Sequence, residues 1–258
     1  MSQILNIATY RFVGIDDPAA LKATWLPKAK TLGLKGTILL AHEGINLFLA
    51  GAETAIRSFM AFVDDDSRFA KLDLKESWSE TVPFKRMKIK LKREIVTFRQ
   101  EGVDPVNAPA PFMPPAELKR RLDAGEAIVL LDTRNDVEVA KGTFDNAVFW
   151  GNRNFTEFGH MARDHISELR GKTVVSFCTG GIRCEKAAPY LRDLGASDVY
   201  QLEGGILKYF EEVGSDHYEG GCFVFDERRA VGADLSATGL APDGSFALNP
   251  PAEPTPQT

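Results

Sequence analysis

The stretch from Val174 to Leu194 reads Val-Val-Ser-Phe-Cys-Thr-Gly-Gly-Ile-Arg-Cys-Glu-Lys-Ala-Ala-Pro-Tyr-Leu-Arg-Asp-Leu. A β-branched and aromatic run ends at Cys178, two glycines and an arginine follow, and apolar residues then recur at helical spacing. This pattern predicts a strand, a tight loop and a helix. The loop would lie at the N-terminus of the helix, where free N–H groups and the helix dipole favour an anion.

Cys178 is the candidate reactive residue of this loop. The start of a helix, the flexible pair Gly180-Gly181 and the charge of Arg183 should together lower the pKa of its thiol. The alternative is an inert buried cysteine that closes a strand, because free cysteine is among the most buried residue types. We favour the reactive interpretation, since the glycine pair and the arginine serve no obvious packing purpose.

The composition is that of an ordinary globular protein of one large or two ordinary domains, with 258 residues, 44% hydrophobic and 26% charged residues. A net charge of −5 gives no global sign of nucleic-acid binding, so that function would need a local basic patch. We find neither a signal peptide nor an apolar run near the roughly 20 residues that span a bilayer, so no membrane partner is expected. Cys178, Cys184 and Cys222 form neither a disulfide framework nor a zinc site, which favours a reduced, cytoplasmic setting.

Residues 1–99 are predicted to form one α+β domain. Its elements follow in the order β-α-β-β-α-β, which is the ferredoxin-like (acylphosphatase-like) arrangement. The helix signal at Asp17-Pro18 is strong, although Pro27 should kink or shorten that helix. The predicted strands are 4–12, 35–41, 45–50 and 72–78, and the predicted helices are 18–32 and 52–63.

A basic segment follows within this domain, where residues 86–92 alternate between cationic and apolar side chains. Such alternation predicts a strand with one basic face. Lysines that protect a sheet edge from aggregation are one explanation, but contact with a phosphate backbone accounts better for so many cations in an acidic protein. The candidate RNA-binding residues are Lys85, Arg86, Lys88, Lys90 and Lys92.

The second half of the chain begins after a Pro-rich linker at 100–115. Residues 116–217 alternate strands and helices, which predicts an α/β domain with a mostly parallel sheet and helices on both faces. Catalytic loops of such sheets lie at the carboxyl ends of strands. One more strand from Cys222 and a disordered tail are expected within 218–258. The predicted strands of the α/β domain are 127–131, 147–150, 172–177 and 198–201.

Three features of this α/β region resemble the rhodanese domain, whose cysteine carries a persulfide. They are the strand end Asp132-Thr-Arg134, the late Leu202-Glu-Gly-Gly205, and the loop. The loop spans six residues from Cys178 to Arg183, through Thr179, Gly180, Gly181 and Ile182. Related phosphatases need Cys-x5-Arg, and position 184 holds a cysteine instead, which argues against phosphatase activity.

A wider resemblance joins both halves of the chain. The segments 36–46, 83–90, 178–186 and 221–226 are similar, in this order, to motifs of the tRNA uridine hydroxylase family. The resemblance implies an oxidoreductase that converts the wobble uridine of tRNA (position 34) to 5-hydroxyuridine. It implies that dioxygen is the co-substrate, that tRNA is the partner, and that Cys178 is catalytic. The extra C-terminal cysteines of some members are missing, so we expect no metal-binding tail.

The site hypothesis assigns a role to each of five residues. Cys178, as thiolate or persulfide, would add to C6 of uracil and make C5 electron-rich. Arg183 would stabilise the anionic loop or a tRNA phosphate, whereas Asp132 and Arg134 would hold the loop by hydrogen bonds. Cys184 would either resolve a persulfide or disulfide with Cys178 or simply pack in the first turn of the helix.

Cofactors and alternative functions follow from what the chain contains. No Gly-x-Gly-x-x-Gly follows a strand, and His160 and His165 are spaced off one helical face, so we identify no cofactor and no metal site. No pattern points to the reductant or to a stable protein partner. A sulfurtransferase that moves sulfur from thiosulfate or a persulfide to a thiol is the main alternative. A non-catalytic RNA-binding scaffold is the other, and the intact loop argues against it.

Overall fold

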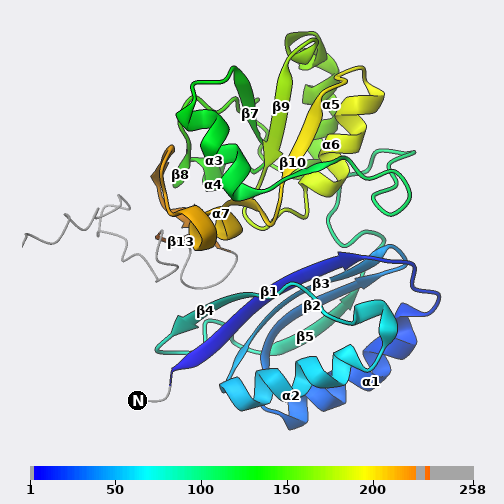
Figure 1. Ribbon diagram of the computed structural model, residues 1–258. Helices are drawn as coiled ribbons and strands as arrows, with labels where there is room; N and C mark the ends of the chain where they lie inside the picture. Colours follow the sequence, from blue (N-terminus) through cyan, green and yellow to red (C-terminus); the bar gives the residue numbers. More distant parts are fainter. Residues whose placement is uncertain (1–2, 225–229, 233–258) are drawn as a thin grey trace, which may run out of the picture.

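The computed structural model describes residues 3–224 and 230–232, arranged in two lobes (Figure 1). The N-terminal lobe is a sheet covered by helices, and the second lobe is a parallel sheet between helices. The mixed α/β class predicted from the sequence is therefore confirmed. The tail predicted to be disordered lies outside the described residues.

The N-terminal lobe contains the predicted β-α-β-β-α-β order and one further strand. Its sheet has the strand order β4-β1-β3-β2-β5, in which β5 lies at the edge and runs parallel to β2. The other neighbouring pairs are antiparallel. The elements are β1 (Ile4–Phe12), α1 (Pro18–Thr31), β2 (Lys35–Ala41), β3 (Gly44–Gly51), α2 (Glu53–Asp64), the short η1 (Ser67–Phe69), β4 (Lys75–Ser79) and β5 (Met87–Leu91).

Local signals explain two of these elements. The carboxylate of Asp17 caps α1 by accepting the N–H groups of Ala19 and Ala20, both at 3.0 Å. Pro27 neither ends nor shortens α1, which continues to Thr31. At the start of β3, Gly44 has φ of +147°, and a Cβ there would lie 2.1 Å from the carbonyl oxygen of Arg11. Only glycine fits where this hairpin passes β1.

The two faces of the N-terminal sheet have different roles. Helices α1 and α2 cover one face, with side chains such as Leu5, Ile7 and Ile89 in the shared core. The other face lies towards the second lobe (Figure 1). Side chains alternate along a strand, so Asn6, Ala8 and Tyr10 of β1 share this second face. In β5 the predicted apolar face is incomplete, because Leu91 is 47% exposed.

The second lobe contains a parallel sheet with the order β6-β10-β9-β7. Helices α5 and α6 pack on one face, and α3 and α7 pack on the other. The elements are β6 (Phe112–Met113), α3 (Pro115–Asp123), β7 (Ile128–Asp132), α4 (Asp136–Val139), β8 (Gly142–Phe144), α5 (Phe155–His165), η2 (Ile166–Leu169), β9 (Thr173–Phe177), α6 (Cys184–Asp193), β10 (Val199–Leu202), α7 (Gly205–Val213), β11 (Tyr218–Gly220), β12 (Cys222–Phe223) and β13 (Ala230–Val231).

Three segments differ from the sequence-based expectation. The strand predicted at 147–150 is wrong: within this segment only Val148 forms a bridge, to Leu131 of β7, and the ring of Trp150 stacks on His165. The last residues of the Pro-rich linker form β6 and lengthen the parallel sheet. Beyond residue 217, β11 pairs with β8, and β12 pairs with β13. These pairings join distant segments, which local patterns do not reveal.

Candidate active site

The Cys178 loop lies where β9 ends and α6 begins, at the carboxyl edge of the parallel sheet. The backbone N–H of Gly181 donates a hydrogen bond to the sulfur of Cys178 over 3.1 Å. Gly181 has φ of +96°, and a Cβ there would lie 2.9 Å from the hydroxyl oxygen of Tyr10. A glycine is therefore required at position 181 for two reasons: the loop must turn sharply there, and the N-terminal lobe approaches Gly181 closely.

The loop favours the charged form of Cys178, although only 1% of the residue is exposed. Burial raises the pKa of the thiol, but a hydrogen bond from Cys184, the charge of Arg183 and the backbone N–H groups of Arg183 and Gly181 lower it more strongly. The resulting pKa is about 6. Cys178 is therefore mainly a thiolate at neutral pH, which is the nucleophilic form of cysteine.

Cys184 stays protonated beside it. Burial raises the pKa of its thiol well above the usual value, and the neighbouring charge of Cys178 raises it further. Its sulfur lies 3.7 Å from the hydroxyl oxygen of Thr133, which donates to the carbonyl oxygen of Phe177 over 3.0 Å. The structure thus brings Cys184 to Cys178 as a donor that stabilises the thiolate.

Arg183 turns inward to a carboxylate that the sequence analysis missed. Its guanidinium donates two hydrogen bonds to Glu138 of α4, at 3.0 and 2.7 Å, and Glu138 is fully buried. The paired charges satisfy each other and still leave Arg183 close enough to stabilise Cys178. Glu138 is visible in the sequence only as the third residue of a capping box on Asn135, which gives no sign of this contact.

Asp132 and Arg134 form a second buried pair beneath the loop, joined by bonds of 2.9, 3.2 and 2.7 Å. Arg134 also donates to the carbonyl oxygen of Gly142 over 2.6 Å, and Thr143 donates to Asp132 over 2.8 Å. Both charged side chains have no exposed surface, so in this arrangement they hold the ends of β7 and β8 together.

The N-terminal lobe adds side chains that the sequence analysis did not assign to the site. The hydroxyl of Tyr10 donates to Glu185 in the first turn of α6 over 3.1 Å. Next to it, the ammonium of Lys186 binds both oxygens of Glu43, at 2.9 and 2.8 Å, and Lys186 is only 3% exposed. The signal for this contact lies in two motifs already noted, Glu43 in segment 36–46 and Glu185-Lys186 in segment 178–186.

The basic segment lies apart from this cluster. Strand β5 is at the opposite side of β2 and β3 from β1, which carries Tyr10. Lys92 lines a surface hollow that also contains Arg93 and Arg99. Among the candidate RNA-binding residues, Lys88 is half-buried, and the exposed ones are Lys85, Arg86, Lys90 and Lys92.

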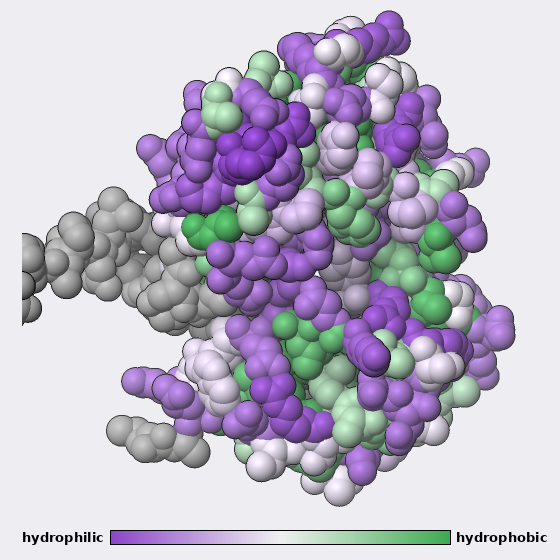
Figure 2. All heavy atoms as spheres, in the orientation of Figure 1, coloured by the Kyte–Doolittle hydropathy of each residue, from purple (hydrophilic) through white to green (hydrophobic). Residues whose placement is uncertain are grey.

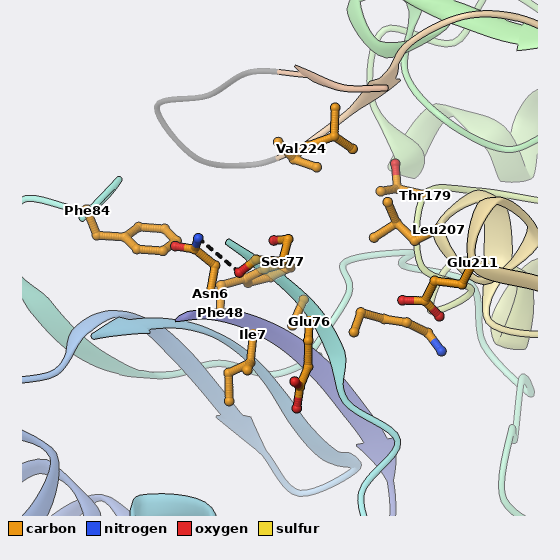
Figure 3. A pocket seen from close by; sticks show the side chains of 13 residues that line it. Asn6, Ile7, Phe48, Glu76, Ser77, Phe84, Thr179, Leu207, Glu211 and Val224 are labelled. Atoms are coloured by element: carbon orange, nitrogen blue, oxygen red, sulfur yellow. Dashed lines mark hydrogen bonds between the residues drawn. The ribbon is translucent and has the colours of Figure 1, made fainter. Parts of the chain in front are cut away.

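A pocket between the lobes adjoins the loop at Thr179 (Figure 3). Asn6 and Phe84 line it from the N-terminal lobe, and Leu207 and Glu211 line it from α7. On the face shown in Figure 2, the most hydrophobic surface lies near this junction. The outer surface of both lobes is mainly hydrophilic in the same view. The region next to the reactive sulfur thus offers both apolar and polar groups to a ligand.

Within residues 3–224 and 230–232, the structure places no three side chains of His, Cys, Asp or Glu so that they could hold a metal ion. None of the helices in the described part of the chain is long and apolar enough to cross a membrane.

Comparisons with known proteins match both lobes. The UPF0176 acylphosphatase like domain matches residues 4–95, and the rhodanese-like domain matches residues 114–212. The tRNA uridine(34) hydroxylase of Delftia acidovorans is 56% identical over 246 residues, covering 93% of this chain and 94% of that protein. That of Thiobacillus denitrificans is 54% identical over 241 residues, covering 92% and 97%. Among solved structures, a rhodanese-like domain from Anabaena sp covers 43% of this chain and 79% of its own, with 24% identity and a TM-score of 0.37.

Proposed function

This chain belongs to the tRNA uridine(34) hydroxylase family, and from that premise we propose that Cys178 is the residue that attacks the uracil ring. The protein is an oxidoreductase that hydroxylates uridine 34 of tRNA. The product we propose is 5-hydroxyuridine, with dioxygen as the source of the added oxygen. The reaction takes place in the cytoplasm.

The proposed reaction begins with a nucleophilic addition. The thiolate of Cys178 adds to C6 of uracil, and the electrons of the C5=C6 bond move towards C5 and the C4 carbonyl oxygen. C5 becomes electron-rich and takes up one oxygen atom from dioxygen. The second oxygen atom leaves as water. Formation of this water and of the C5 hydroxyl group requires two electrons from an external reductant, such as two molecules of a small thiol that become a disulfide, and three protons, one of which is returned when C5 loses its hydrogen. Loss of the C5 proton then restores the double bond and releases Cys178.

The observation that carries this proposal is the state of the sulfur. The thiol of Cys178 has a pKa of about 6, and the backbone N–H of Gly181 donates a hydrogen bond to its sulfur. A neutral thiol adds to a pyrimidine much more slowly than a thiolate, because the thiolate is the nucleophile. The loop therefore supplies at neutral pH what the addition to C6 requires.

Binding of tRNA is assigned to the N-terminal lobe. The exposed cations of β5 and its flanks would neutralise phosphates of the tRNA backbone, which fixes the position of the RNA without reading its sequence. The pocket beside Thr179 lies between this lobe and the reactive loop, so a base of the anticodon loop can enter it while the backbone follows the N-terminal lobe. The cations involved are Lys85, Arg86, Lys88, Lys90 and Lys92.

The test is nucleoside analysis of tRNA from a deletion strain that expresses each variant. Cys178→Ser should abolish 5-hydroxyuridine at position 34, because a serine hydroxyl is not ionised at neutral pH. Cys222→Ala, which removes a buried thiol from the core of the second lobe, is the matched control and should retain the modification. Wild-type levels of 5-hydroxyuridine in the Cys178→Ser strain would refute the assignment.

A further inference from the structure

We propose that Glu185 is the base that removes the C5 proton of uridine 34, positioned by Tyr10 from the N-terminal lobe. This inference rests on the proposed function, because it assigns the last proton transfer of that reaction. It gives the N-terminal lobe a part in the chemistry in addition to the binding of RNA.

The geometry places the pair beside the loop that carries the reactive sulfur. Tyr10 lies on the face of β1 that is turned towards the second lobe, and its hydroxyl donates to one carboxylate oxygen of Glu185 over 3.1 Å. The same hydroxyl lies against Gly181, whose N–H donates to the sulfur of Cys178 over 3.1 Å. Phenol and carboxylate, one from each lobe, therefore meet beside the loop that carries the thiolate, close enough for the charge of Cys178 to raise the pKa of Glu185.

The carboxylate of Glu185 is available for proton transfer. Its Oε1 accepts from Tyr10, and within the described part of the chain no hydrogen bond occupies Oε2. Burial raises the pKa of Glu185, the hydrogen bond from Tyr10 lowers it and the charge of Cys178 raises it, so that it reaches about 7. A base with a pKa near the working pH is the most effective at proton transfer.

The other charged groups around Glu185 are paired with partners of their own. On its own helix Arg183 binds Glu138, Lys186 binds Glu43 of the N-terminal lobe, and Cys184 stays protonated. From the elements packed against it, Glu185 therefore faces the neutral phenol of Tyr10 and the negative charge of Cys178. A contact that served only to join the lobes would be expected to resemble Lys186–Glu43, in which both charges are neutralised.

The proton transfer balances without any other reagent. Once C5 carries its hydroxyl group, it still holds its original hydrogen, and C6 is bonded to the sulfur of Cys178. The carboxylate of Glu185 takes the C5 hydrogen as a proton, and the electron pair of that C–H bond forms the C5=C6 double bond. The C6–S bond breaks with its electrons on sulfur, which returns the thiolate.

The experiment measures kcat, KM and the pH profile of the full-length enzyme on tRNA that carries tritium at C5 of uridine 34. Glu185→Gln should lower kcat and tritium release by about 100-fold or more with little change in KM, since loss of a general base costs about 10²–10⁴. It should also accumulate a covalent protein–tRNA adduct on denaturing gels, because the addition to C6 is left intact. Glu157→Gln on the surface of α5 and Tyr200→Phe of β10 are the matched controls and should behave like the wild type.

Tyr10→Phe separates a positioning role from a structural one. This variant loses the hydrogen bond that lowers the pKa of Glu185, so the pKa of Glu185 should rise. The part of the profile of kcat against pH that reports this pKa, near 7, should therefore move to higher pH. Above the new pKa, kcat should return to the wild-type value. A wild-type kcat and pH profile for Glu185→Gln would overturn the inference. If instead Cys178→Ser retains product formation and the wild type forms no adduct, the proposed function itself fails. The two failures are therefore distinguishable.

Discussion

The Cys178 loop and the sheet face opposite it stabilise their polar groups by different means. Around the loop, charges are buried in pairs, Arg183 with Glu138 and Asp132 with Arg134. On the facing side of β1 the groups are neutral, Asn6 and Tyr10. The second lobe thus holds a charged sulfur in a fixed environment, and strand β1 of the N-terminal lobe faces it with neutral groups, while Glu43 of that lobe is paired with Lys186. Substitutions in the two regions should therefore affect stability and the reactivity of Cys178 differently.

The largest expected effect comes from the buried pair behind the loop. Arg183→Met leaves Glu138 as an unpaired buried charge, which should cost about 3–5 kcal/mol of the free energy of unfolding. It also removes a charge that lowers the pKa of Cys178, so the thiol should titrate at higher pH. Denaturant unfolding and the pH dependence of alkylation by iodoacetamide measure the two effects. Glu138→Gln is the companion variant, and an unchanged alkylation midpoint in Arg183→Met would contradict the electrostatic account.

A smaller effect is expected at the contact between the lobes. Lys186→Met leaves both oxygens of Glu43 without their cation, and should loosen the sheet face over the loop. Cys178 is 1% exposed, so a reagent reaches it only when the surrounding structure opens locally. Alkylation of Cys178 at pH 8 should become several-fold faster, with the midpoint of its titration unchanged. An unaltered rate would show that the lobes do not control access to the sulfur.

The pH dependence of alkylation in the wild-type protein tests, without a mutation, whether the loop stabilises the thiolate of Cys178. The pKa of Cys178 is lowered to about 6, so the reactive thiolate is present above pH 6 and is lost as the pH falls through 6. The alkylation rate should therefore level off by about pH 7 and fall about tenfold for each unit below 6. A midpoint near the value of an unperturbed thiol, about 8.5, would contradict this account.

The smallest effects belong to the basic edge strand. Replacing Lys90 and Lys92 by glutamate should raise KM for tRNA and make it less dependent on salt, while kcat stays the same. Each lost phosphate contact should lower the slope of log affinity against log salt by about 1. Replacing Lys28 and Lys30 at the end of α1 by glutamate is the control for net charge. Equal effects of both double variants would show that only overall charge matters.

The same two regions differ in how far the sequence predicts them. The loop could be located from local features, because the six residues from Cys178 to Arg183, which include two glycines, and the following helix are contiguous. Glu138 could not be found in this way, since its contact with Arg183 joins residues 45 positions apart. Tyr10 is one of several residues in an alternating strand, and the packing of the two lobes decides which of them meets the loop.

The helices and strands also differ in this way: those specified by local sequence were predicted, and those that depend on distant partners were not. Helices with clear caps, such as α1 after Asp17, and the hairpin between β2 and β3 were predicted within a few residues. The segment 147–150 was wrongly predicted as a strand, because an apolar run does not specify a partner. The pairing of β8 with β11, and of β6 with β10, depends on segments far apart in the chain.

The most direct test of the central claim is to trap the addition of Cys178 to uridine 34. A tRNA with 5-fluorouridine at position 34 can accept the thiolate at C6, but its C5 fluorine cannot leave as a proton does. After incubation and digestion, mass spectrometry should find the nucleotide bonded to the peptide that contains Cys178, and Cys178→Ser should give no adduct. Hydroxylation of normal tRNA at the full rate, with no adduct or with one on another residue, would contradict the account.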